Sequence, residues 1–250
     1  MTRRTTRPTT RRITGSGPPG PALALALSCH PGPTVAMTLT LGAAAALTGR
    51  SAGQCLLVAA TVATGQVTVG WVNDLVDVGR DRRAGRRDKP VARGLVSPRT
   101  VATATGCAVL LVVPLSLANG TASGSAHLAA VASAWSYNLL FKATALSLLP
   151  YAVSFGLLPA FLSYGGLGPG RHGGPPTVTM TALAGLLGVG IHVLNTLPDL
   201  AEDQANGVRH LPLRVAGHTG VRSLRRASVA GTASVALAMA VAGLRTGVRR

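Results

Sequence analysis

The sequence predicts an all-α, multi-pass transmembrane helical bundle with about seven helices. Hydrophobic residues make up 47% of the 250 residues and charged residues 12%, and the mean hydropathy is +0.38. Seven segments run about 18 to 21 residues without a charge, which is the length that a helix needs to cross a hydrocarbon core of roughly 30 Å. Backbone groups in lipid must be bonded within their own segment, so these segments are expected to be helices. A soluble bundle would need polar stripes at the helical period, and the segments have none.

In chain order, the first element is a basic arm. Residues 1–20 are rich in Thr, Arg, Pro and Gly and predict a disordered segment, while 21–250 are expected to form a single membrane-embedded domain. The apolar segments are 31–49, 53–72, 100–118, 123–141, 146–165, 177–197 and 227–244. Ala, Gly, Ser and Thr dominate them, which favours close helix packing. A Gly- and Pro-rich loop is expected at 165–176.

The basic residues follow a topology pattern. If the N-terminus is cytoplasmic and the segments alternate, nineteen of the 24 Lys and Arg residues face inward. This positive-inside bias predicts a cell-membrane protein with the N-terminus and both acidic windows on the cytoplasmic side. The net charge of +17 is therefore interpreted as a membrane signal, attractive to anionic lipid, rather than as a nucleic-acid interface. Arg245, Arg249 and Arg250 run against the pattern.

The acidic residues are confined to two short windows. Each window directly follows a long apolar segment, and the seven acids are Asp74, Asp77, Asp81 and Asp88, then Asp199, Glu202 and Asp203. The spacing within each window places carboxylates on one face of a helix, where like charges repel unless they are neutralised. Mg²⁺ prefers such oxygen ligands and bridges them to substrate phosphates. The alternative is ion pairing with the neighbouring arginines alone, which is weak at a surface.

Two motifs resemble the signatures of the UbiA superfamily of intramembrane prenyltransferases. The first is Asn73-Asp74-x-x-Asp77-x-x-x-Asp81, followed by Arg87-Asp-Lys-Pro-Val91. The second is Asn195-x-x-x-Asp199-x-x-x-Asp203-x-x-x-Gly207, followed by Leu211-Pro212. Between them, Tyr137 to Lys142 is similar to a stretch of the same family. The resemblance covers roughly residues 31–225.

The resemblance implies a magnesium-dependent transfer of a prenyl group from an allylic polyprenyl diphosphate to a hydrophobic acceptor, commonly an aromatic ring. The central cavity would open to the cytoplasmic face. By position, the catalytic residues are Asp74, Asp77, Asp199 and Asp203. The implied metal ligands are Asn73, Asp74, Asp77, Asp81, Asn195, Asp199 and Asp203. The implied diphosphate contacts are Lys142, Tyr137, Arg80, Lys89 and Arg93.

Two departures from the family pattern stand out. Asn195 occupies a position where the family usually has an acid, and about seven helices are found where the family has nine. The last two helices of the family fold have no counterpart among the seven apolar segments. We therefore expect a lateral gap beside the last helix, facing lipid or another protomer. His192, one turn before Asn195, is more typical of a hydrogen-bonded structural residue than of an acceptor contact.

Other classes of membrane protein remain as alternatives. A transporter or non-catalytic protein would bury acids near the bilayer midplane, whereas these acids follow helix ends. CDP-alcohol phosphotransferases also use aspartates with Mg²⁺, but their signature contains Asp-Gly followed by Ala-Arg, which this chain lacks.

Overall fold

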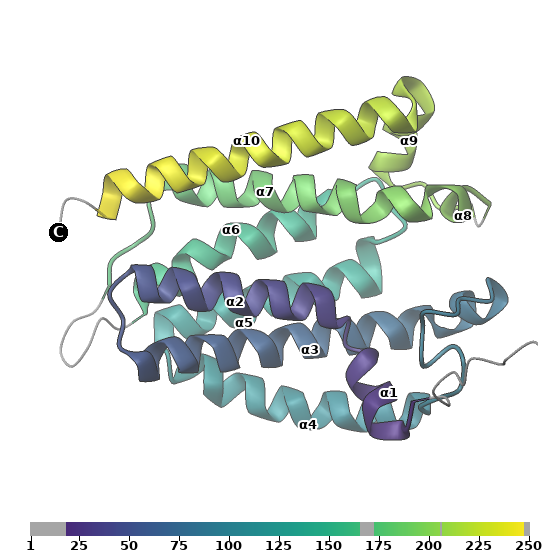
Figure 1. The fold of residues 1–250 in the computed structure, drawn as a ribbon, viewed down its shortest axis with the longest axis horizontal. Coiled ribbons are helices and arrows are strands. Elements are labelled where there is room, and N and C mark those ends of the chain that lie inside the picture. The colour runs from purple at the N-terminus through teal and green to yellow at the C-terminus, as the bar shows by residue number, and fades with distance from the viewer. Residues whose placement is uncertain (1–18, 166–172, 206, 248–250) are drawn as a thin grey trace, which may run out of the picture.

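The computed structural model describes residues 19–165, 173–205 and 207–247, and these residues form helices joined by turns and by a longer segment, 84–97 (Figure 1). The elements are α1 (Pro21–Leu27), α2 (Pro31–Leu47), α3 (Ala52–Arg83), α4 (Pro98–Leu117), α5 (Thr121–Ser136), η1 (Tyr137–Phe141), α6 (Leu148–Tyr164), α7 (Val178–Thr196), η2 (Leu197–Asp199), α8 (Leu200–Ala205), α9 (Leu211–Thr219) and α10 (Val221–Gly247). Nearly all of the predicted arm 1–20, most of the Gly- and Pro-rich loop, and Arg249 and Arg250 lie outside the described residues.

Each of the seven apolar segments coincides with a helix, namely α2 to α7 and α10. The main difference concerns α3, which continues through the first acidic motif to Arg83. From the sequence, the second apolar segment ends at residue 72 and 73–99 is interpreted as a cytoplasmic loop; this is wrong for its first part, because the loop begins only after Arg83. The reason is that Asn73 to Arg83 contains neither Gly-Pro pairs nor a proline, so nothing in this stretch stops the helix.

By length and hydropathy, four of the described helical stretches are able to cross a membrane: Ala52–Arg83, Pro98–Leu117, Val178–Ala205 and Val221–Gly243. The pair α1 and α2, bent by 61°, makes a fifth if it is counted as one span. Helices α5 and α6 have 16 and 17 residues and are shorter than the roughly 20 residues that a full crossing takes. Seven complete crossings therefore stay a prediction.

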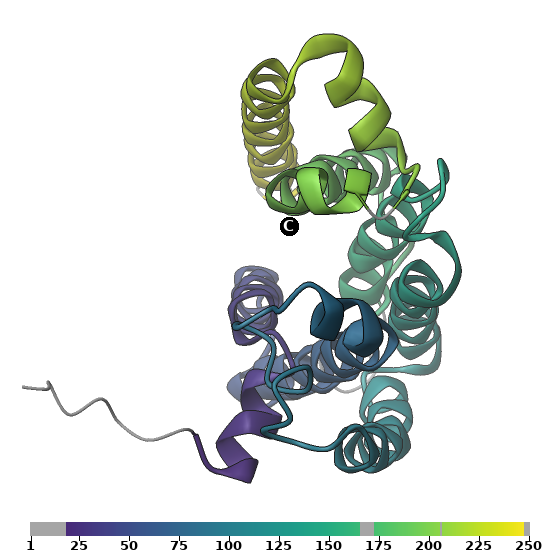
Figure 2. The same ribbon diagram turned by 90° about the vertical axis from the view of Figure 1, so that its right-hand side faces the viewer.

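The helices pack in chain order around an arc. Each of α2 to α6 packs on the next helix, and α10 packs on α7. Figure 2 shows the arc end on, with α2 and α10 at its two ends. A cluster of Leu41, Val58 and Phe161 joins α2, α3 and α6. This order brings the end of α3 and the short helix α8, far apart in sequence, to the same end of the bundle (Figure 1).

The break between α1 and α2 lies directly against α3. His30 interrupts the chain there with φ 58°, a left-handed conformation that is uncommon for a residue with a side chain. Gly70 permits the approach, because a Cβ at this position would overlap the backbone of Cys29. Trp71 Nε1 donates to the Leu25 carbonyl at 3.0 Å and holds α1 in place. As a result, His30 comes beside the first acidic motif.

We expect Gly70→Ala to destabilise the protein by about 1–3 kcal/mol, because the added methyl group forces α3 and the α1–α2 break apart. Thermal unfolding in detergent, followed by circular dichroism, measures the effect. Gly79→Ala is the matched control, since its Cβ would meet only the Arg83 side chain at 3.7 Å. Equal unfolding temperatures for the two variants would contradict the close contact at Gly70.

Candidate active site

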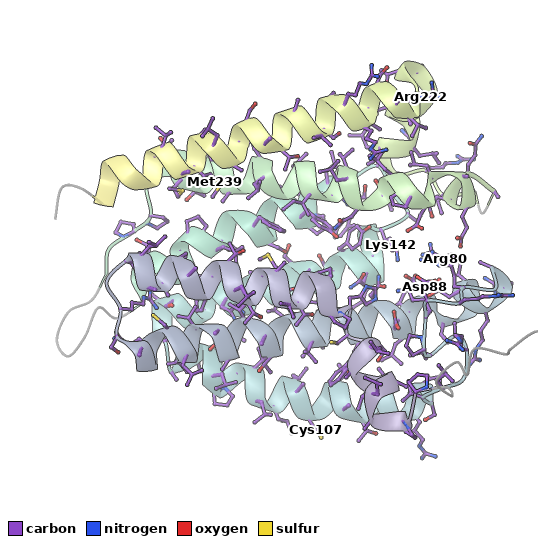
Figure 3. The ribbon with its side chains drawn as sticks, in the orientation of Figure 1. Arg80, Asp88, Cys107, Lys142, Arg222 and Met239 are labelled. Atoms are coloured by element: carbon purple, nitrogen blue, oxygen red, sulfur yellow. The ribbon has the colours of Figure 1, made fainter. Side chains whose placement is uncertain are left out.

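A cavity of about 610 Å³ lies inside the arc, and its wall comes from α2, α3, α5, α6, α7 and the segments that follow α3 and α7. One end is polar and holds residues of both acidic motifs. The remainder is mainly apolar, with Met37, Val62, Val131, Phe155 and Leu158 in the wall. Figure 3 shows Lys142, Arg80 and Asp88 at the polar end, between α3 and α7. The cavity thus joins a charged mouth to an apolar interior.

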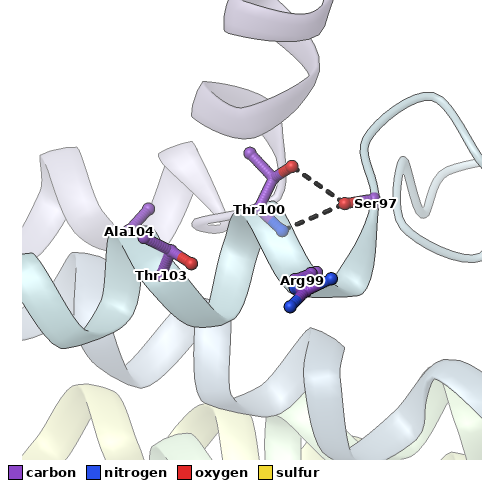
Figure 4. Close-up of a pocket in the computed structure, with 5 residues that line it drawn as sticks. All are labelled: Ser97, Arg99, Thr100, Thr103 and Ala104. Atoms are coloured by element: carbon purple, nitrogen blue, oxygen red, sulfur yellow. Dashed lines mark hydrogen bonds between the residues drawn. The ribbon is translucent and has the colours of Figure 1, made fainter.

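A second hollow, of about 450 Å³, lies along the start of α4 (Figure 4). Its lining consists of Ser97, Arg99, Thr100, Thr103 and Ala104. The Ser97 hydroxyl accepts from the Thr100 backbone N–H and caps the helix. This lining contains no carboxylate, so we place the candidate site in the larger cavity.

The first motif occupies the end of α3. Asp74, Asp77 and Asp81 are spaced three and four residues apart, so their side chains follow one face of the helix, as the sequence predicts. All three are buried, with exposed fractions of 2%, 6% and 3%. Buried carboxylates need partners or a cation, because an isolated buried charge is costly.

Asp74 lies in a small cluster of polar groups. Its Oδ1 is 2.8 Å from His30 Nε2 and accepts a hydrogen bond from Lys89 Nζ at 2.7 Å. Lys89 also donates to Asn73 Oδ1 at 3.3 Å. The other carboxylate oxygen of Asp74, Oδ2, is buried and has no hydrogen-bond partner among the described residues. Asp74 itself is not among the residues that line the cavity, although its neighbour Asn73 is.

Asp77 pairs with two cations. The Lys142 ammonium donates to its Oδ2, and Arg80 lies 3.3 Å from the same oxygen. Burial lowers the pKa of Lys142, and the charge of Asp77 opposes that effect. Lys142 follows η1, a π-helical turn from Tyr137 to Phe141. Such turns often occur at functional sites. This one is held to α3 by Asn138, whose Oδ1 accepts from Asn73 at 2.9 Å.

The second motif spans a break in the helix. Pro198 is compatible with the first turn of a helix but not with the interior of a longer one, and α7 gives way to the 3₁₀ turn η2 and then to α8. The single common face that the sequence predicts for Asn195, Asp199 and Asp203 is therefore interrupted. All three residues nevertheless line the same cavity.

Two arginines join the motifs across the mouth of the cavity. Arg80 of α3 contacts Asp77 and also lies 3.7 Å from Asp203. Arg86 contacts Asp199 at 3.1 Å and Asp88 at 2.9 Å, and its hydrogen bonds lower the pKa of the Asp88 carboxyl to about 2. The two acidic windows, more than a hundred residues apart in sequence, thus form one site.

Residues 35–248 match the model of the UbiA prenyltransferase family. The chain belongs to that family. No curated protein is similar enough in sequence to match it. Its helices and its membership together identify a multi-pass membrane protein.

The UbiA fold is also evident from solved structures. The structure of a UbiA homolog from Archaeoglobus fulgidus bound to GPP and Mg²⁺ superposes with a TM-score of 0.65 at 16% identity, covering 87% of this chain and 86% of that one. The same homolog bound to DMAPP and Mg²⁺ gives a TM-score of 0.66 at 16% identity, with 86% and 75% covered. At this identity the likeness concerns the fold.

The ligand atoms at the site of this UbiA-family protein suit a magnesium ion that is also bound by a diphosphate. Its acidic side chains offer hard oxygen ligands, and Asp74 Oδ2 is buried without a partner. Within the described residues, no three His, Cys, Asp or Glu side chains converge closely enough to hold a metal alone. Mg²⁺ is commonly bound by one or two carboxylates together with substrate phosphates, so the residues fit the ion in that form.

Three residues discussed in the sequence analysis, Asp74, Arg93 and His192, are not among the residues that line the cavity. Arg93 is exposed, donates to the Arg87 carbonyl at 3.4 Å, and is not among the residues that line the cavity. Its contact with the diphosphate stays a prediction. His192 is fully buried outside the lining, and its Nε2 is 3.1 Å from Ser147 Oγ. This geometry agrees with the structural role that the sequence favours for it.

Several residues of the site were not assigned to it from the sequence. His30 and His210 each contact a motif carboxylate, Arg86 joins the windows, and Asn138 fastens η1 to α3. Only Arg86 carries a signal, since it lies within the run of arginines after α3. His30 lies 44 residues before Asp74, and only the packing of the helices brings the two together, whereas His210 follows Asp203 by seven residues and reaches it through the turn between α8 and α9.

Proposed function

We propose that this UbiA-family protein transfers a prenyl group from an allylic diphosphate to a hydrophobic, aromatic acceptor, with Mg²⁺, inside the membrane. The observation that carries the proposal is the meeting of two acidic motifs at the polar mouth of an otherwise apolar cavity. The homolog from A. fulgidus, which shares the fold, binds GPP and DMAPP with Mg²⁺.

The polar mouth has groups that suit a diphosphate. Lys142, Lys89 and Arg80 pair with carboxylates, and their remaining N–H groups can donate to the oxygens of an anionic ligand. When bound, Mg²⁺ supplies positive charge that compensates the diphosphate and the carboxylates. Asp74, Asp77, Asp199 and Asp203 are proposed as its main ligands, with Asn73, Asp81 and Asn195 as further ligands or orienting groups. Tyr137 lies in the cavity wall beside them.

The apolar interior suits the reacting part of the donor. As the allylic C–O bond ionises, the lysines and Arg80 stabilise the negative charge that develops on the leaving diphosphate. Tyr151 and Phe155, stacked with ring centroids 6.3 Å apart, offer aromatic faces to the carbocation, and the surrounding wall excludes water. The acceptor then forms a bond to C1, and the proton that it loses passes to the departing diphosphate.

A transfer assay tests the proposal directly. Membranes that contain the protein are incubated with radiolabelled allylic diphosphates of several chain lengths and a panel of aromatic acceptors, with and without Mg²⁺. We expect labelled, prenylated acceptor only in the presence of Mg²⁺. Transport without product would favour a transporter, and transfer of a phosphoalcohol group instead of a prenyl group would favour another lipid-handling enzyme.

We further propose that 21–250 form one domain and that the mouth of the cavity faces the cytoplasm. In a background without Cys29, Cys55 and Cys107, Ala84→Cys and Ala205→Cys place reactive thiols at that mouth. Both are expected to react with a membrane-impermeant maleimide only from the cytoplasmic side, because the positive-inside bias orients the chain. Pro175→Cys, before α7 at the other end of the bundle, is the control and should react from outside. Labelling of positions 84 and 205 from opposite sides would exclude a shared site.

A further inference from the structure

Asp203 has a buried partner outside the acidic motifs, His210. The imidazole is only 2% exposed, and its Nε2 lies 2.9 Å from Asp203 Oδ2. The same ring begins α9, since its Nδ1 accepts the backbone N–H of Leu213 at 3.1 Å. One side chain therefore joins the second motif to the start of the next helix.

These two contacts determine which nitrogen of His210 carries the proton. A backbone N–H can only donate, so Nδ1 must present its lone pair to Leu213. In the neutral ring the hydrogen is then on Nε2, which donates to Asp203 Oδ2. Asp203 Oδ2 is thereby engaged, whereas Oδ1 lies toward Arg80 at 3.7 Å. The hydrogen bond therefore constrains the rotation of the carboxylate.

Two backbone hydrogen bonds fix the segment that leads to His210. The Val208 N–H donates to the Asp203 carbonyl at 3.0 Å, and the Arg209 N–H donates to the Ala143 carbonyl at 3.2 Å. Ala143 follows Lys142, the cation that pairs with Asp77. The position of His210 is thus set by both the second motif and the turn that carries Lys142.

We propose that His210 is a positioning residue that holds Asp203 with one oxygen directed at the metal–diphosphate site, an inference that rests on the proposed function. A hydrogen bond to a ligating carboxylate fixes its orientation before the ion arrives, and loss of such an outer contact typically weakens metal affinity by about 10–100-fold. His210 itself is not a ligand, because both of its ring nitrogens are engaged.

Two near-isosteric variants separate the two roles of the ring. His210→Asn keeps an acceptor close to the Leu213 N–H and is a good helix cap, but it is too short to reach Asp203. His210→Gln extends an amide N–H toward Asp203 but is a poor cap. His218→Asn, on the exposed end of α9, is the control. The affinity for Mn²⁺ in the presence of inorganic diphosphate is measured by electron paramagnetic resonance, together with the unfolding temperature.

We expect His210→Asn to weaken Mn²⁺ binding about tenfold or more with a nearly unchanged unfolding temperature. His210→Gln should bind Mn²⁺ within about threefold of wild type with a lower unfolding temperature. If His210→Asn bound Mn²⁺ with wild-type affinity, the positioning role of His210 would be overturned and the proposed function would stand. Absence of Mn²⁺–diphosphate binding in the wild-type protein would instead overturn the proposed function, and this role with it.

The tautomer provides a test that needs no metal. Nitrogen-15 NMR of the histidine-labelled protein, with His210→Asn used to assign the signal, should show a protonated Nε2 and a bare Nδ1. The opposite tautomer would exclude donation to Asp203 and overturn the proposal.

Discussion

Replacing Asp77 or Asp199 by Asn is expected to lower prenyl transfer at least about a hundredfold, because each change removes the negative charge of a proposed metal ligand from one of the two motifs that meet at the cavity. A loss of this size corresponds to the removal of one preorganised electrostatic contact in a catalytic site. Transfer of label from an allylic diphosphate, measured with purified protein in detergent or liposomes, gives the effect. Turnover at the wild-type rate in either variant would contradict the two-motif site.

Asp88→Asn is the matched control for this prediction. Asp88 lies in the same acidic window, pairs with Arg86, and is the most exposed carboxylate among the ion pairs, with 61% of its side chain accessible. The pair with Arg86 is bidentate, but solvent screens it at this exposure and Asn keeps one acceptor oxygen, so Asp88→Asn should still fold. Its turnover should remain within a few-fold of wild type. Because Asp77 also neutralises Lys142, the amount of folded Asp77→Asn protein is checked by size-exclusion chromatography.

Withdrawal of divalent cations should abolish both transfer and donor binding. The diphosphate would otherwise meet the buried carboxylates of Asp74, Asp77 and Asp203, and like charges repel strongly at low dielectric. Equilibrium binding of a radiolabelled donor in the presence of EDTA, and after addition of Mg²⁺, measures this dependence. Full recovery with Mg²⁺ is expected. Donor binding of equal strength in EDTA would show that the lysines and arginines suffice without a metal.

The helices were the most predictable part of the fold. Seven apolar segments became α2 to α7 and α10, because a long uncharged segment satisfies its backbone as a helix whatever its neighbours are. Helix ends were less predictable. The α3 helix runs on to Arg83 because nothing in Asn73 to Arg83 stops it, and hydropathy, which falls at the first acid, does not reveal this.

The contacts within the site were harder to predict than its acids. Periodicity placed Asp74, Asp77 and Asp81 on one face of a helix, since that relation is local. The partners of those acids are distant in sequence, with Lys142 65 residues from Asp77 and His30 44 residues from Asp74. No local rule connects such residues. The arginines at the end of α3 and after it were expected to pair with acids, but the pairing of Arg86 with Asp199 depends on how the segment after α3 meets η2.

The sequence by itself determined that this protein is a membrane-spanning helical bundle with two carboxylate-rich motifs, because hydropathy, helical spacing and charge are properties of the chain alone. The tertiary structure decided that the motifs share one cavity, that Arg80 and Arg86 lie between them, and that His30 contacts Asp74. Those relations arise from helix packing in an arc, where close approach depends on small residues such as Gly70 and on the order in which helices return to the same end of the bundle.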